Sequence, residues 1–74
     1  MFLPYTTMQH GTITELVDRG FGFIRRVGIK EHLYFHSDDL VGLVFGKLTK
    51  GDKVTFNVVQ SKKGPYATRV SEPN

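Results

Sequence analysis

Residues 19–24 read Arg-Gly-Phe-Gly-Phe-Ile, and this stretch decides both the fold and the working surface of the chain. Residues two apart in a β-strand point to the same face. Phe21 and Phe23 therefore stand side by side on one face, whereas Gly22 and Ile24 point to the other. Phe pairs in strands usually belong to a core, but the opposite face would then present glycines and an arginine to solvent. We expect the two rings to lie outward, where a flat nucleic-acid base stacks on them.

Short alternating segments, separated by turns that contain glycine, follow one another along the rest of the chain. No helical period is sustained, which predicts a small all-β barrel or sandwich. Residues 37–39 look like the cap of a single helical turn at Leu40, and residues 61–65 form a loop. The expected strands are residues 11–17, 21–27, 32–36, 53–60 and 66–70. Their alternation points seven side chains inward: Ile13, Ile24, Leu33, Phe35, Val54, Phe56 and Val58.

The 74 residues are enough for one domain, which we place at residues 11–70, between an extension (residues 1–10) and a tail (residues 71–74). The chain has no cysteine, which excludes disulfides and cysteine-bound zinc and fits a reducing compartment. No apolar run reaches the roughly 20 residues of a membrane span, and residues 1–10 lack the pattern of a signal peptide. We therefore expect a cytoplasmic protein. The net charge of +3 favours a polyanionic partner.

Catalytic and metal-binding patterns are weak in this sequence. His32 and His36 share one face of a strand, but no third ligand accompanies them, so we expect no metal site. Asp38 and Asp39 are paired carboxylates that a helix cap explains without catalysis. No nucleophile has a base nearby, and the chain is too short to enclose a pocket for a small-molecule substrate. We expect neither an enzyme nor a cofactor.

A second motif, Leu33-Tyr-Phe-His36, follows the first one along the chain. In this order the two motifs resemble the nucleic-acid motifs of the cold-shock domain family, and the resemblance extends over residues 11–70. It implies a five-stranded antiparallel β-barrel of the OB type that binds single-stranded RNA and DNA with low sequence specificity, often as an RNA chaperone. By matching position, it also implies which residues contact the strand. The base-stacking residues would be Phe21, Phe23, Tyr34, His36 and Phe45, the backbone contacts Arg19 and Lys63, and an additional ring Tyr66.

The chain departs from the family pattern in its first strand and after the second motif. Thr14 and Glu15 stand where the family usually has a Lys-Trp pair, and Ser37 replaces a common aromatic residue. Two lost stacking positions correspond to about a hundredfold weaker binding or more. A different class of function is a small β-barrel module whose aromatic face meets another protein. The sequence leaves open this alternative, the choice between RNA and DNA, and the oligomeric state.

Overall fold

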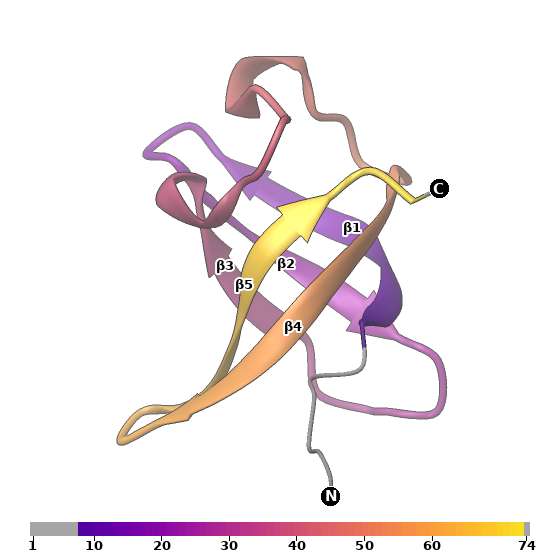
Figure 1. Cartoon of the computed structure of the whole chain (residues 1–74), viewed down its shortest axis with the longest axis vertical. Coiled ribbons are helices and arrows are strands. Elements are labelled where there is room, and N and C mark those ends of the chain that lie inside the picture. The colour runs from indigo at the N-terminus through magenta and orange to yellow at the C-terminus, as the bar shows by residue number, and fades with distance from the viewer. Residues whose placement is uncertain (1–7, 74) are drawn as a thin grey trace, which may run out of the picture.

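Five strands form close to their expected positions in a computed structural model that describes residues 8–73 (Figure 1). β1 and β5 each begin two residues earlier than expected, so only Lys62 and Lys63 remain between β4 and β5. Ser71 of the expected tail belongs to β5, whereas residues 1–7 and 74 lie outside the described residues. The strands are β1 (Gln9–Val17), β2 (Phe21–Arg26), β3 (Leu33–His36), β4 (Lys53–Ser61) and β5 (Gly64–Ser71).

The strands close into a barrel in the order β1-β2-β3-β5-β4. The expected five-stranded barrel is thus confirmed, with one correction: β3 and β5 pair in parallel, whereas the other four neighbouring pairs are antiparallel. A closed ring of purely antiparallel neighbours needs strands that alternate in direction, and such alternation requires an even number of strands. Five strands must therefore leave at least one parallel pair, and here it joins Tyr34 to Tyr66.

The barrel interior is filled by apolar side chains from every strand. Six of the seven expected inward residues, all but Val58, are buried, which confirms the alternation on which they depended. Val58 is only partly buried and packs against the edge of this cluster. The buried core consists of Ile13, Ile24, Leu33, Phe35, Val54, Phe56, Ala67 and Val70.

Gly22 is buried between the two outward Phe residues of β2 and lies opposite Phe35 in the register. A Cβ atom at this position would lie 2.9 Å from Cε1 of Phe35 and would also collide with the carbonyl oxygen of Glu15. No side chain has room there without a shift of the core ring or of β1. The glycine between the two Phe residues therefore allows the wall of the barrel to close over Phe35.

β1 contains a register shift at Thr14. Ile13 pairs with Ile24, whereas Glu15 pairs with Phe23, so the two residues Thr14 and Glu15 lie against a single step of β2. A bulge of this kind bends the strand and redirects a side chain. Simple alternation after the buried Ile13 would turn Glu15 inward, but the shift places it outward, where 56% of its side chain is exposed.

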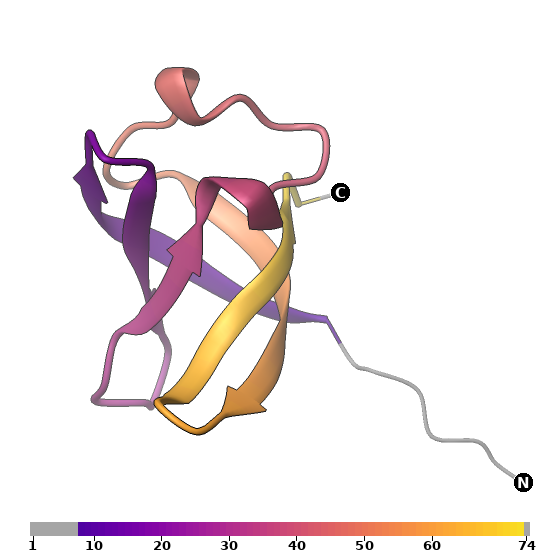
Figure 2. The same cartoon turned by 90° about the vertical axis from the view of Figure 1, so that its left-hand side faces the viewer.

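Residues 37–52 connect β3 to β4 and arch over one end of the barrel (Figure 2). They include two single-turn 3₁₀ helices, η1 (Ser37–Asp39) and η2 (Phe45–Lys47). The expected helical turn therefore exists, but residues 37–39 form the turn itself and the capping residue is His36. Within residues 8–73, no helix is long and apolar enough to cross a membrane.

Candidate nucleic-acid interface

The outer faces of β2 and β3 carry three aromatic rings in mutual contact. Ring centroids lie 5.6 Å apart for Phe21 and Tyr34, 6.1 Å for Phe23 and Tyr34, and 6.2 Å for Phe21 and Phe23. The register explains the cluster, because Phe23 lies opposite Tyr34 and Phe21 lies opposite His36. We refer to Phe21, Phe23, Tyr34 and His36 together as the aromatic platform.

The aromatic platform faces away from the core, as the alternation predicts. The residues between its members, such as Gly22 and Phe35, are buried, and Tyr34 is 38% exposed. Phe21, Phe23 and His36 are half-buried, which is less exposure than we expected. Neighbouring rings in edge-to-face or tilted contact cover part of one another. The platform is therefore a self-supporting cluster with an open outer side.

Tyr66 lies next to the aromatic platform because of the parallel pairing of β5 with β3. The register runs from Glu15 on β1 to Phe23 on β2, and then to Tyr34 on β3. It continues from Tyr34 to Tyr66 on β5 and ends at Val59 on β4. Neighbouring residues in such a row point to the same side of the sheet. The row therefore holds three aromatic residues from three strands.

A hollow of about 630 Å³ lies between the aromatic platform and the hairpin that joins β4 to β5. Lys63, an exposed residue of the hairpin turn, is one of the residues that line this hollow. The volume of this hollow lies within the range of small-ligand pockets. The lining residues are Tyr34, His36, Asp39, Ser61, Lys63, Gly64, Pro65 and Tyr66.

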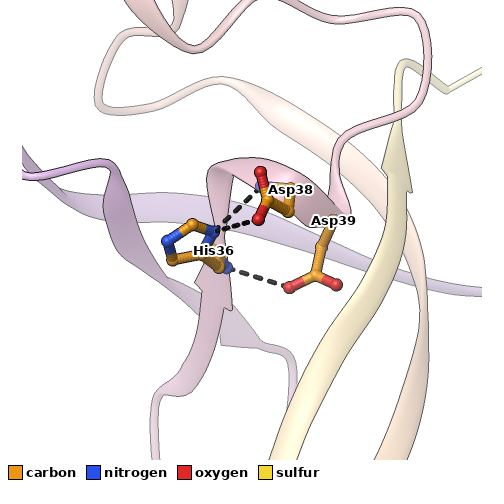
Figure 3. Close-up of polar contacts among 3 residues, drawn as sticks. All are labelled: His36, Asp38 and Asp39. Carbon is orange, nitrogen blue, oxygen red and sulfur yellow. Dashed lines mark hydrogen bonds and ion pairs between the residues drawn. The ribbon is translucent and has the colours of Figure 1, made fainter.

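His36 is held in place by η1 (Figure 3). Its Nδ1 accepts a hydrogen bond of 3.0 Å from the N–H of Asp38, and its own N–H donates to Oδ2 of Asp39 at 3.1 Å. The same Nδ1 lies 3.6 Å from the Asp38 carboxylate. In the shorter of these two Nδ1 contacts, the imidazole nitrogen accepts from the backbone. The bond from Asp38 thus orients the imidazole, and the bond to Asp39 holds the backbone of His36 opposite Phe21.

His32, which was expected to share a strand with His36, lies just before β3 and is engaged differently. It is exposed, and its Nδ1 lies 3.2 Å from Oγ1 of Thr14 across the sheet. Thr14 also lies 3.4 Å from the carbonyl oxygen of Phe23, to which its hydroxyl donates. In the described part of the chain, no group of three His, Cys, Asp or Glu side chains is arranged to hold a metal ion.

The structure does not bring Phe45 to the aromatic platform. Phe45 is half-buried in η2, and its ring centroid lies 6.4 Å from that of the core residue Phe35. It lines a separate hollow with Leu16 and Leu48 at the end of the barrel. Arg19 is exposed in the turn between β1 and β2, two residues before the first ring of the platform.

An ion pair that the sequence did not predict borders the aromatic platform on the β1 side. Nζ of Lys50 lies 3.5 Å from Oε1 of Glu15, and both side chains are more than half exposed. Lys50 reaches this position because the turn before β4 pairs with β1, where the N–H of Gly51 donates to the carbonyl oxygen of Ile13. The carboxylate beside Phe23 is thus partly neutralised. No local pattern signals this contact, because the two residues lie far apart in the sequence.

A family model described as the 'Cold-shock' DNA-binding domain matches residues 9–73. A cold shock-like protein of Aquifex aeolicus is 42% identical over 53 residues, which are 72% of this chain and 76% of that protein. A probable cold shock protein A of Mycolicibacterium smegmatis is 38% identical over 64 residues, 85% of this chain and 96% of that protein.

A solved structure titled drosophila Unr CSD456 is similar in fold, with a TM-score of 0.76 at 28% sequence identity. The alignment covers 93% of this chain but only 28% of that longer one.

Proposed function

Because the chain belongs to the cold-shock domain family, a family of nucleic-acid-binding domains, we propose that it binds single-stranded RNA or DNA with low sequence specificity. The single observation that carries this proposal is the aromatic platform. Three rings gathered on an outer face, rather than inside the barrel, provide surfaces on which successive bases stack. We assign the chain a binding role without catalysis, and we place it in the cytoplasm, since a cysteine-free chain fits a reducing compartment.

Stacking accounts for the expected low specificity. Every base has a flat π-face, so a ring binds any base with about 1–3 kcal/mol. Phe23 meets both Phe21 and Tyr34 at steep interplanar angles, 84° and 68°. In such edge-to-face contacts each ring covers only part of its neighbour, and Tyr34 keeps 38% of its surface exposed for a strand. Tyr66 extends the set onto β5, and His36 completes it beside Phe21.

Positive side chains near the rings supply the contacts with the backbone of the strand. Arg19 precedes the platform in the β1–β2 turn, and Lys63 stands on the rim of the hollow beside Tyr34. Each phosphate that they neutralise releases counterions, so that binding weakens as salt rises, with a slope of about 0.7 per contact for a single strand. Phe45 is the least supported member of the proposed contact set, because it packs over a core ring instead of joining the platform.

An RNA-chaperone activity follows from this mode of binding. A base that is stacked on the platform and covered by the protein is not available for pairing. The protein therefore binds the unpaired form alone and shifts the equilibrium of a weak hairpin toward it by mass action.

The test is a titration of fluorescently labelled oligo-U and oligo-dT, followed by anisotropy, at about 50 mM and about 200 mM salt. We expect both oligomers to bind and both affinities to fall at the higher salt. Phe23→Ala removes one ring and should weaken binding about 5- to 150-fold, the equivalent of 1–3 kcal/mol. The matched control is Val44→Ala, which truncates an apolar residue that is 62% exposed outside the platform.

Normal binding by the Phe23→Ala variant would show that the platform is not the binding surface. If neither oligomer binds the wild type, and the aromatic face instead captures a protein in a salt-insensitive way, the chain is an interaction module. Equal losses in Phe23→Ala and Val44→Ala would also contradict the proposal, because the loss would then not depend on the ring.

A further inference from the structure

We propose that a bound single strand runs beyond the aromatic platform onto a second outer-face surface made by Arg25, Thr12 and Lys53. We call these three residues the basic row. The inference rests on the proposed function, since it lengthens the same binding site, and it adds contacts on β1 and β4 to those on β2, β3 and β5. The ligand chemistry is the phosphate backbone of single-stranded nucleic acid.

The register places the basic row next to the platform. Arg25 lies two residues after Phe23 on β2, so both point outward from the same strand. Thr12 pairs with Arg25 on one side and with Lys53 on the other, which joins three strands in one row. Nζ of Lys53 donates to Oγ1 of Thr12 at 3.1 Å, and this hydrogen bond draws the ammonium group across β1 toward Arg25.

The two cations of the basic row have no carboxylate partner among the described residues. The ion pairs there join Lys50 to Glu15 and His36 to Asp38. The nearest carboxylate in sequence to Lys53, that of Asp52, accepts hydrogen bonds from the backbone N–H and the hydroxyl of Thr49. Two exposed cations, one on either side of Thr12, together attract an anion. A phosphate backbone that leaves the platform along β2 meets them first.

A hollow of about 400 Å³ adjoins the basic row at its far side. The residues that line it include the exposed His10 and Lys53 and the apolar residues Val27 and Pro73. Val27 is 94% exposed, a large apolar surface that burial in the barrel does not explain. A flat imidazole, apolar side chains and a cationic side chain in one lining suit one nucleotide, with its base against the apolar side chains and its phosphate on Lys53.

The test compares oligo-U of about four nucleotides, enough for the platform, with oligo-U of about ten, within the range of site sizes for one OB fold. The variant carries Arg25→Gln and Lys53→Gln together. The wild type should bind the longer oligomer more tightly and with a steeper salt dependence. The double variant should bind the short oligomer as the wild type does, but its affinity should not increase with oligomer length. For the longer oligomer, the slope of log affinity against log salt should become shallower by about 1.4, which is 0.7 for each charge removed.

The matched control, Lys47→Gln with Arg69→Gln, removes the same net charge from exposed positions outside the basic row. Lys47 belongs to η2, which lies beside the other end of the β1–β2 hairpin, near Leu16 and Val17. This control should keep the gain with length. All four substitutions replace exposed side chains, and thermal melts verify that each variant is folded.

The basic row is not a binding surface if the Arg25→Gln and Lys53→Gln variant still binds the longer oligomer more tightly than the shorter one. The same conclusion follows if the control loses this increase in affinity to an equal extent. If the wild type binds the short oligomer and gains nothing with length, the inference fails while the proposed function stands. If neither oligomer binds the wild type, both fail together.

Discussion

The inner and outer faces of the same two strands, β2 and β3, use aromatic rings for opposite purposes. Phe35 points inward and is completely buried, whereas Tyr34, the residue before it, points outward and is 38% exposed. A buried ring stabilises the barrel through area removed from water. An outward ring that keeps part of its surface exposed stays available to a ligand. One step along the strand therefore decides whether a ring serves stability or binding, and residue type alone does not.

The largest effect is expected for a substitution on the inner face, which should lower the stability of the barrel. Phe56→Ala removes a completely buried ring from the core and should lower the free energy of unfolding by about 3–5 kcal/mol. Such a loss is a large fraction of the total stability of a small domain. The matched outer-face variant, Phe23→Ala, should change the midpoint of urea unfolding little. Comparable losses in the two variants would mean that the platform is part of the core.

A smaller loss of stability is expected for a substitution at Gly22, which has no side chain and lies close to the core ring of Phe35. Gly22→Ala adds a methyl group that meets Phe35 and the backbone of β1. Overpacking of this kind costs about 1–3 kcal/mol, which urea unfolding measures directly. The matched control is Gly46→Ala, because a Cβ atom at Gly46 meets nothing within 4 Å and the residue is not in the positive-φ region. An unchanged stability for Gly22→Ala would show that β2 does not lie this close to Phe35.

The aromatic platform can be extended at Glu15, which the register places directly opposite Phe23. Glu15→Trp adds a ring at the edge of the platform and removes a negative charge. Affinity for a pyrimidine oligomer should rise by about 1–3 kcal/mol for the stacked base. Stacking is not a screened interaction, so most of this gain should persist at high salt. A Trp variant that binds no better than the wild type would exclude β1 from the binding face.

The smallest effect is expected for Glu15→Gln, which removes the charge without adding a ring. This change also releases Lys50, whose Nζ lies 3.5 Å from the carboxylate. The affinity should rise less than in the Trp variant, because the wild-type carboxylate is already partly neutralised by this exposed pair. The gain should shrink as salt rises through screening. A gain that is insensitive to salt would contradict an electrostatic origin.

The period-two alternation made the two faces of the barrel predictable from the sequence. It separated Ile24 and Phe35 from Phe23 and Tyr34 because the side-chain direction in a strand depends only on local backbone geometry. The same alternation would have turned Glu15 inward. The register shift at Thr14 instead turns the Glu15 side chain outward. No residue in this segment predicts the shift.

By itself, then, the sequence determined which side chains of β2 and β3 face the core and which face outward, since that choice is local. Only the tertiary structure decided which outward residues become neighbours. Closure with five strands forces a parallel pair, and this pair brings Tyr66 beside Tyr34. β1 likewise pairs with both β2 and β4, and this places Arg25 and Lys53 on either side of Thr12. Which residues become neighbours depends on the register between segments that are distant in the sequence. Loop geometry and barrel closure set this register, and no short stretch of sequence encodes it.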